Sequence, residues 1–475
     1  MFQGACYVLL FLACVAVCAQ VGSRSLRQGM LLVSSFALYL TWAPWFSAVL
    51  VASIVVNFLV GNWLRRNLHW LPLSAGIVFN LGLLGVFKYL PEVAPNLRGG
   101  SLTSLANLAL PLGISFWTFQ ALSYLFDLYR EEELDPSFVE FALYMVFFPV
   151  TISGPVCRMP EMLPQFRSDE KTAGSDILHG LRRIAIGVLM MQLARLLGQG
   201  ILAGDGIVRG FDRITQWSGA DVWCLALGYG LQLFFDFAGY THIAVGAAKA
   251  LGITVPENFE RPFASTNPSV FWTRWHMSLS FWIRDYVFFP LATTRREIWW
   301  RNLALVISMA AFGVWHRASL LFLLWGCYHG VLLVSHRLLQ QMQRKLNWEP
   351  PAKLGSTLGW LTTTIFISLG WIFFRANSLS QAKQMLSAIV SPAGYSSHTL
   401  SLSLYCLVAA LASGYAIVLL VGSMLDRSPQ SATIALLARW RWFWIPSLYA
   451  LALLFVFMIT HGQEASAGQL MYRRF

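Results

Sequence analysis

The chain has 475 residues, of which 57% are hydrophobic and only 12% charged, and its net charge is +12. Soluble domains carry about 25% charged residues, so this composition excludes an ordinary soluble globule and predicts a polytopic membrane protein. The basic residues stand in short loops between apolar runs, which indicates positive-inside topology and argues against a nucleic-acid partner.

The first twenty residues are apolar, but the first positive charges, Arg24 and Arg27, follow this run. A secretory signal has its basic residues before the apolar run, so we expect a retained first span with its N-terminus outside. Further apolar stretches follow in chain order at residues 30–42, 46–64, 71–90, 108–129, 139–156, 177–197, 221–251, 303–315, 319–335, 357–374, 402–425 and 442–460. Several are short for a span of ~20 residues, so we predict about ten or eleven full spans.

Two connections receive specific predictions. The run 139–156 contains Pro149, Gly154 and Pro155, which favours a segment that enters the membrane and returns. Residues 337–353 form the longest polar connection, which we expect to be a cytoplasmic loop. Because no polar linker divides the chain, we predict one helical membrane domain over residues 1–475. The seven cysteines lack C-x-x-C spacing and are interpreted as small core residues.

Residues 274–286 read "RWHMSLSFWIRDY", an unusually polar stretch for this chain. Placed on one helix, the stretch has an apolar stripe and a polar face formed by His276, Ser280 and Arg284. Arg274, Ser278 and Asp285 fall on a third side. An interfacial amphipathic helix would account for this pattern without any catalytic role.

Three more ionisable residues stand inside apolar runs: Asp236, His316 and His329. Such groups are costly in a membrane, and a histidine is well suited to act there as a general base. If the arginines at 295, 296 and 301 mark the cytoplasmic face, fifteen helical residues place His316 ~22 Å deeper. A satisfied core histidine remains the alternative for each position. The histidine spacings preassemble no metal site, so we expect no metal.

Six motifs occur in a fixed order along the chain: "LPLGISFWTFQALSYLFDLYR", "SGPVCRMPEMLPQF", "FDFAGYTHIAVG", "ENFERPF", "FWTRWHMSLSFWIRDYVFFPL" and the pair "GVWH" and "WGCYHG". In residues and order they resemble the motifs of the membrane-bound O-acyltransferase superfamily, and within it those of the bacterial alginate O-acetyltransferase branch. The resemblance runs from about residue 29 to beyond Trp371, with its best-matching core at about 108–377. His276 and His316 are 40 residues apart, as expected for that branch.

The resemblance implies an all-α membrane fold around a funnel or tunnel, with His316 at its neck as the catalytic residue. It also implies an acyl group, usually acetyl, taken from a cytoplasmic thioester donor. That donor, acetyl-CoA or a phosphopantetheinyl carrier, is a co-substrate, and no tightly bound cofactor is expected. The acceptor would be an exported polysaccharide, reached with an extracytoplasmic SGNH-type partner, and the location would be the bacterial cytoplasmic membrane.

The expected roles follow from the matched positions. His316 would act as general base or, in a minor variant, as a nucleophile that forms an acyl-imidazole. His276 would orient the donor or hold a polar network, with a purely structural role as the alternative. Arg274, Arg284 and Ser280 are candidate donor contacts, although lipid headgroups would suit the arginines equally. The further candidates are Asp236, Asp285, Trp315, Arg317 and His329.

Two departures bear on the substrate. Arg317 stands where the family usually has glycine after the catalytic histidine, and the Gly-Gly-Asn that often follows the "RDY" motif is replaced by "PLATTRRE". D-alanyl transfer from a carrier protein is the alternative within the enzyme class. A transporter or flippase with histidine proton relays is an alternative from another class, although no inverted repeat is visible. An accessory binding protein with a degenerate site is the third alternative.

Overall fold

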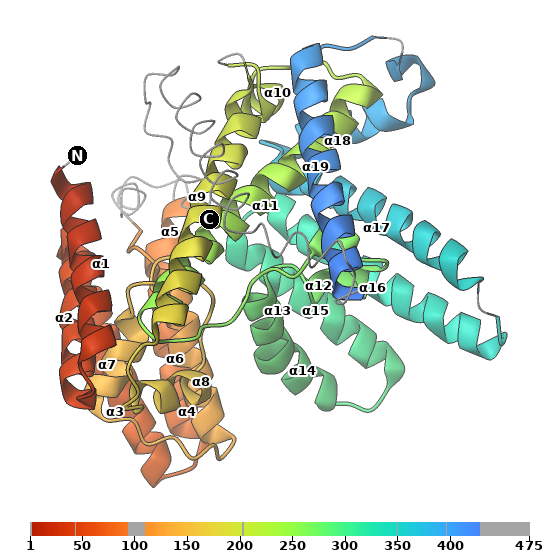
Figure 1. Cartoon of the computed structure of the whole chain (residues 1–475). Helices are drawn as coiled ribbons and strands as arrows, with labels where there is room; N and C mark the ends of the chain where they lie inside the picture. The colour runs from red at the N-terminus through yellow and green to blue at the C-terminus, as the bar shows by residue number, and fades with distance from the viewer. Residues whose placement is uncertain are drawn as a thin grey trace, which may run out of the picture. The chain divides into compact units, whose positions relative to one another are not determined.

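The computed structural model describes residues 2–42, 44–93, 110–201, 204–348, 350–395 and 397–427. Within them, helices are the only regular structure apart from one antiparallel bridge between Phe259 and Trp275 (Figure 1). Eight helices in this part of the chain are long and apolar enough to cross a membrane. The all-α polytopic prediction is therefore confirmed, while the apolar stretch 442–460 lies outside the described residues.

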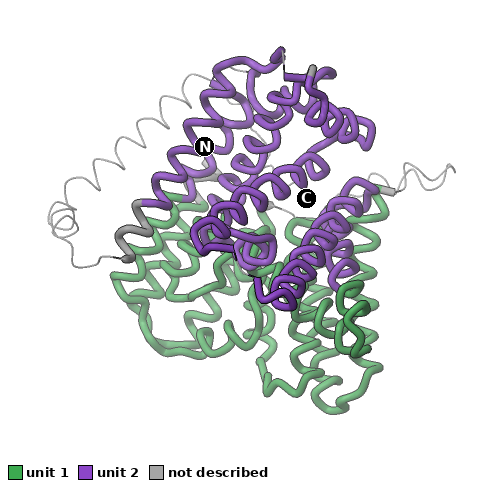
Figure 2. The backbone as a smooth tube through the Cα atoms, turned by 90° about the vertical axis from the view of Figure 1, so that its right-hand side faces the viewer, with its two compact units in different colours: residues 1–186, 240–258, 276–304 green, residues 187–239, 259–275, 305–475 purple. Residues whose placement is uncertain are grey.

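The chain forms two compact units that alternate along the sequence (Figure 2). Unit 1 comprises residues 1–186, 240–258 and 276–304, and unit 2 comprises residues 187–239, 259–275 and 305–475. Three helices contribute residues to both units: α9 (Gly174–Gln199), α11 (Gly219–Ala250) and α15 (Ile298–His316).

The other helices of unit 1 lie mostly in the N-terminal part of the chain. They are α1 (Phe2–Gln20), α2 (Arg24–Trp42), α3 (Pro44–Arg66), α4 (Trp70–Leu84), η1 (Gly85–Tyr89), α5 (Leu90–Val93), α6 (Ile114–Tyr129), α7 (Phe138–Val146), α8 (Met159–Phe166), α13 (Met277–Ile283), η5 (Arg284–Phe288) and α14 (Phe289–Thr293). Helix α6 packs on α3 and α4, and α7 packs on α2. Aromatic side chains such as those of Trp117, Tyr124 and Phe141 belong to the buried core of this unit.

The other helices of unit 2 come from the later part of the chain. They are α10 (Ile207–Asp212), η4 (Pro262–Ala264), α12 (Pro268–Trp272), α16 (Leu320–Lys345), α17 (Ala352–Arg375), α18 (Leu379–Val390), η6 (Pro392–Tyr395) and α19 (Leu402–Arg427). Helix α12 packs against α16 and α17, which also pack against each other.

The structure bears on the predictions for the connections at residues 337–353 and 139–156. The predicted polar loop at 337–353 is wrong over its first half, because α16 continues as a helix to Lys345. In α16 the polar residues lie opposite an apolar face, so they can be exposed while the segment stays helical. Helix α7 has only nine residues and is followed by a turn over 148–154, so this run does not form one spanning helix.

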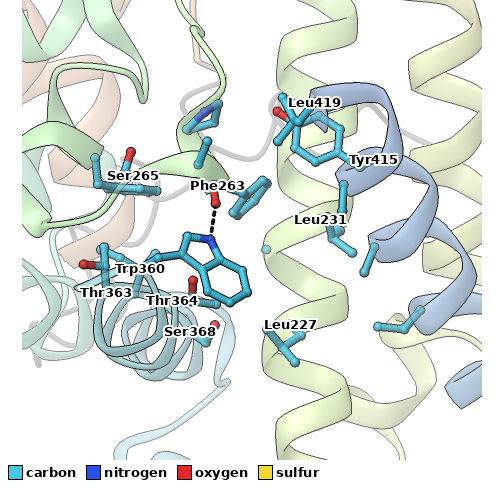
Figure 3. Close-up of a pocket in the computed structure, with 18 of the residues that line it drawn as sticks. Leu227, Leu231, Phe263, Ser265, Trp360, Thr363, Thr364, Ser368, Tyr415 and Leu419 are labelled. Atoms are coloured by element: carbon cyan, nitrogen blue, oxygen red, sulfur yellow. Dashed lines mark hydrogen bonds between the residues drawn. The ribbon is translucent and has the colours of Figure 1, made fainter. Parts of the chain in front are cut away.

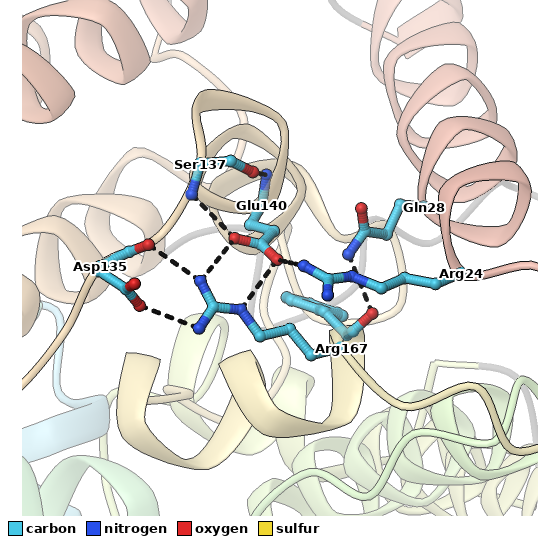
Figure 4. Close-up of polar contacts among 7 residues, drawn as sticks. Arg24, Gln28, Asp135, Ser137, Glu140 and Arg167 are labelled. Carbon is cyan, nitrogen blue, oxygen red and sulfur yellow. Dashed lines mark hydrogen bonds and ion pairs between the residues drawn. The ribbon is translucent and has the colours of Figure 1, made fainter.

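A buried carboxylate ties several elements of unit 1 together (Figure 4). Glu140 on α7 is 1% exposed and accepts from Arg24 of α2 and from both Nε and Nη2 of Arg167, at 3.0 and 3.1 Å. It also closes a capping box with Ser137 at the start of α7. Burial alone would raise the pKa of Glu140, but the hydrogen bonds from Arg167 and Ser137 lower it to about 2.

Glycines let α15 and α16 of unit 2 lie against each other. A Cβ added at Gly313 would stand 2.1 Å from the Phe322 carbonyl oxygen, and one at Gly326 would stand 2.2 Å from that of Met309. Neither position has room for a side chain. The glycines of the "GVWH" and "WGCYHG" motifs therefore serve helix contact, which brings the rings of the two helices together.

Candidate functional site

The segment 274–286 is not the single helix that its periodicity predicts. His276 has φ 45° and ψ 51°, a left-handed conformation, and α13 begins only after it, at Met277. A π-helical turn, η5, follows from Arg284. The prediction that His276, Ser280 and Arg284 share one helical face is therefore wrong, because the helical repeat holds neither before residue 277 nor through η5.

Asn258 in unit 1 makes the hydrogen bonds that hold the chain in this non-helical conformation at His276. Its side-chain oxygen accepts from Ser278 Oγ at 2.6 Å and from His276 Nδ1 at 3.3 Å. Its own amide donates to Thr241 Oγ1 at 3.2 Å, and its carbonyl accepts from the Met277 backbone at 2.9 Å. Because a carboxamide oxygen only accepts, Nδ1 of His276 carries the proton in this contact, and Nε2 of the neutral ring carries the lone pair.

The His276 ring is 2% exposed, and this burial lowers its pKa to about 3. It is therefore neutral at physiological pH. Ser278 Oγ also accepts from the backbone N–H of Val156 at 3.0 Å, which joins the network to the "SGPVCRMP" motif. The arrangement holds one neutral imidazole in a fixed orientation.

A second cluster in unit 1 gathers three arginines around Asp285 and Tyr286. Arg158 Nη2 and Arg284 Nε pair with the Asp285 carboxylate at 2.8 and 2.7 Å. Arg130 donates to the Asp285 carbonyl at 2.7 Å. Burial raises the pKa of Asp285, but its hydrogen bonds from Arg284 and Arg158 outweigh this and hold the pKa below its ordinary value.

Tyr286 completes this arginine cluster. Its hydroxyl donates to Asp127 at 2.6 Å, and the guanidinium groups of Arg130 and Arg158 lie 5.0 and 5.1 Å from the centre of its ring. Three guanidinium groups with one directly paired carboxylate form a surface suited to phosphate.

His316 of unit 2 is the last residue of α15 and is 5% exposed. Five aromatic rings lie around its imidazole, with centroid distances between 4.7 and 6.2 Å; they belong to Phe312, Trp315, Phe322, Trp325 and Phe374. The imidazole of His316 thus lies in an apolar enclosure at the C-terminal end of α15.

His329 and His316 both contact the same tryptophan ring. Trp325 contacts both imidazoles, with centroid distances of 5.6 Å to His316 and 4.9 Å to His329. His329 is 1% exposed and neither ring nitrogen has a hydrogen-bond partner among the described residues. A Cβ at Gly370 would stand 2.6 Å from its Nε2, so this glycine makes room for the ring.

The remaining predicted residues divide between the units. In unit 2, Asp236 is buried on α11, Trp315 belongs to the rings around His316, and Arg317 is exposed just after α15. Arg274 is half-buried in unit 2, where its carbonyl accepts from the Glu260 backbone at 3.1 Å. Ser280 is half-buried on α13 of unit 1.

Sequence reasoning missed Asn258, Arg158 and Arg130 as site residues. Each stands within a quoted motif, but the contacts join positions up to 155 residues apart. The sequence feature that could have indicated a role for these three residues is that each belongs to one of the quoted motifs. Among the described residues there is no group of three or more His, Cys, Asp or Glu that could hold a metal ion.

Comparison with known proteins adds a family. A sequence profile of MBOAT, the membrane-bound O-acyltransferase family, matches residues 34–379. A peptidoglycan O-acetyltransferase of Helicobacter pylori is 34% identical over 77% of this chain and 74% of its own length. A probable alginate O-acetylase of Pseudomonas aeruginosa is 29% identical over 82% and 75%. A teichoic acid D-alanyltransferase of Bacillus subtilis is 34% identical over 56% and 69%.

Proposed function

Because this chain belongs to the membrane-bound O-acyltransferase family and is an integral, multi-pass membrane O-acyltransferase, we propose that it transfers acetyl groups to a cell-envelope glycan with His316 as general base. The observation that carries the proposal is the His316 imidazole, buried among five rings at the C-terminus of α15. The family match excludes the transporter interpretation as the main activity.

The proposed chemistry is attack of a hydroxyl on a thioester carbonyl. His316 takes the hydroxyl proton as the new carbon–oxygen bond forms, and the imidazolium returns this proton to the sulfur as the carbon–sulfur bond breaks. The products are an ester and a free thiol. The aromatic enclosure limits water, which protects the thioester from hydrolysis.

The donor is proposed to be acetyl-CoA in the cytoplasm. Coenzyme A carries phosphates, and the arginine cluster around Asp285 offers guanidinium groups that bind phosphate in pairs of hydrogen bonds. Arg284 is the most accessible of its ion-paired arginines, with 49% of its side chain exposed. We propose that His276 helps to orient the thioester donor, because its contact with Asn258 holds the imidazole in one orientation.

The acceptor is proposed to be a sugar hydroxyl of an exported polymer. Relatives that share most of the chain carry the names peptidoglycan O-acetyltransferase and alginate O-acetylase, and both polymers offer such hydroxyls. We expect the bacterial inner membrane as the location and an SGNH-type extracytoplasmic acetyltransferase as partner. D-alanyl transfer from a carrier protein is the second candidate, favoured by the teichoic acid relative.

The test is acyl transfer from radiolabelled acetyl-CoA by membranes that contain wild-type chain, His316→Ala or His179→Ala at matched expression. His179 is an exposed histidine on α9 and serves as the control. Label is measured in cell-envelope glycan. We expect transfer by the wild type and His179→Ala, and a loss of at least about 100-fold in His316→Ala.

Each alternative result has a defined meaning. Equal transfer by all three preparations contradicts the role of His316. Transfer only when D-alanyl carrier protein replaces acetyl-CoA contradicts the proposed donor and supports the second candidate.

A further inference from the structure

Unit 2 contains an open, mostly apolar cavity of about 960 Å³ between α11, α17 and α19 (Figure 3). The hydroxyls of Ser356, Thr357 and Thr363 on its α17 side already donate to backbone carbonyls of the same helix, so they are not available to select a ligand. The arginine cluster of unit 1 is a more selective surface, because its charges attract anions.

Arg130 is the arginine of this cluster that is not ion-paired. Arg158 and Arg284 both pair with the Asp285 carboxylate, whereas Arg130 donates to the Asp285 backbone carbonyl at 2.7 Å. With the described residues Arg130 forms no ion pair, and it is exposed directly after α6. A guanidinium group has five N–H donors, so most donors of Arg130 and its charge stay available to an anion from outside the chain.

Tyr286 holds this guanidinium group in place. The centre of its ring lies 5.0 Å from the guanidinium carbon of Arg130 and 5.1 Å from that of Arg158. A cation is attracted to the face of an aromatic ring, and an arginine in this position can still form hydrogen bonds in its own plane. The Tyr286 ring is itself packed against Phe126 and Trp282, with centroid distances of 5.7 and 5.1 Å. Arg130 therefore rests on a rigid support.

Asp127 is a buried carboxylate whose hydrogen-bonding partner is Tyr286. It is 6% exposed, it accepts from the Tyr286 hydroxyl at 2.6 Å, and its Oδ2 has no hydrogen-bond partner among the described residues. Glu140, by contrast, accepts from two arginines and closes a capping box. Burial of a carboxylate with so few hydrogen bonds is unfavourable, so the stability of the fold does not account for Asp127. Its contact does account for the fixed orientation of Tyr286.

The charge of the cluster matches a phosphate group. Three arginines outnumber the carboxylates of Asp127 and Asp285, which leaves the cluster net positive. Guanidinium groups bind phosphate through pairs of charge-assisted hydrogen bonds. Coenzyme A and a carrier protein both present their thioester on a phosphopantetheine arm, so either donor brings a phosphate to this surface.

We propose that Arg130 binds the phosphate of the donor's phosphopantetheine arm, and that Tyr286, held by Asp127, is the positioning residue that sets the place of its guanidinium group. The inference rests on the proposed acyl transfer and deepens it, because it assigns donor recognition to one arginine. It holds for an arm that belongs to coenzyme A and for one that belongs to a carrier protein.

The test measures KM and kcat for two small donors that differ by one phosphate, S-acetyl-4′-phosphopantetheine and S-acetylpantetheine, in membranes that contain the full chain. For the wild type we expect a KM about tenfold lower for the phosphorylated donor, as for one charge-assisted contact. Arg130→Gln should abolish this preference and leave kcat within about twofold of the wild type. Arg130→Lys keeps the charge but loses the planar fork, so it should keep about a third of the preference.

The matched control is Arg66→Gln. Arg66 is an exposed arginine at the end of α3 in unit 1 and does not belong to the cluster. Its replacement removes the same charge from the protein and should keep the full preference for the phosphorylated donor.

The positioning role is tested with variants of the contact between Tyr286 and Asp127. Tyr286→Phe keeps the ring and loses the hydroxyl, and it should reduce the preference about threefold with kcat unchanged. Asp127→Ala should give the same loss, and the double variant should lose no more, because both changes remove one contact. Asp127→Asn keeps an oxygen acceptor for the Tyr286 hydroxyl and should retain most of the preference.

Three results would overturn the inference: equal KM values for the two donors in the wild type, a preference that survives in Arg130→Gln, or the same loss in Arg66→Gln. Failure of the proposed function is distinguished by a second pair of donors that carry D-alanyl in place of acetyl. Transfer from the D-alanyl pair alone contradicts the proposed acetyl donor, while the phosphate preference within that pair still decides the role of Arg130.

Discussion

Replacement of Glu140 by Gln tests whether the buried carboxylate stabilises unit 1 as strongly as its contacts indicate. Its pKa falls from an ordinary 4.5 to about 2, and one pH unit corresponds to about 1.36 kcal/mol. The ionised group therefore contributes roughly 3 kcal/mol to folding at neutral pH. Because the folded-state pKa is depressed, this contribution is complete above about pH 4.5 and is lost as the pH falls through 2.

Glu140→Gln keeps the shape but removes the charge that Arg24 and Arg167 share. Arg167 keeps its pair with Asp135, and the side chains of Arg24 and Arg167 are 40% and 33% exposed, so the roughly 3 kcal/mol from the pKa is an upper bound for the cost. The matched control is Asp135→Asn, which also removes a carboxylate from Arg167. The Asp135 side chain is 74% exposed, so this change should cost less than about 1 kcal/mol.

The assay heats the full chain in detergent and measures the loss of monodisperse protein. The temperature at which half is lost is the midpoint of thermal unfolding. We expect Glu140→Gln to lower this midpoint by several degrees more than Asp135→Asn does. If the two variants unfold at the same temperature as each other, the electrostatic reasoning is wrong.

Three further outcomes are expected. Asn258→Ala should reduce acyl transfer at least about tenfold because it releases His276, and a fully active, stable variant would contradict this. Gly326→Val should destabilise the chain by more than about 3 kcal/mol, since its Cβ would meet a backbone oxygen at 2.2 Å, whereas Gly82→Ala on open α4 should be tolerated in the same unfolding assay. His276 is buried neutral with a pKa of about 3, so protons favour the unfolded state as pH falls below 6.5, and His276→Gln should show a shallower stability loss between pH 6.5 and 3.

The sequence was sufficient to predict the helical membrane class and the burial of His316. Long apolar runs and an ionisable residue inside one of them are local signals, and α15 extends from Ile298 to His316 as the depth argument requires. The neighbouring rings of Trp315 and Phe312 are also close in sequence.

The surroundings of His276 could not be predicted in the same way. Periodicity assumes a constant helical rotation, but a left-handed residue at His276 resets the direction of the chain. The partner that stabilises this break, Asn258, is 18 residues away. Arg158, which pairs with Asp285, is 127 residues away, so only the folded chain brings them together.

The alternation of the two units along the chain has a consequence for biosynthesis. Residues 187–239 of unit 2 leave the ribosome before unit 1 receives its last segment, 276–304. Neither unit can therefore be completed by the translocon before the other has begun. We expect that the nascent chain must hold early helices in the bilayer unassembled, and that no single cut yields two fragments that each contain one whole unit.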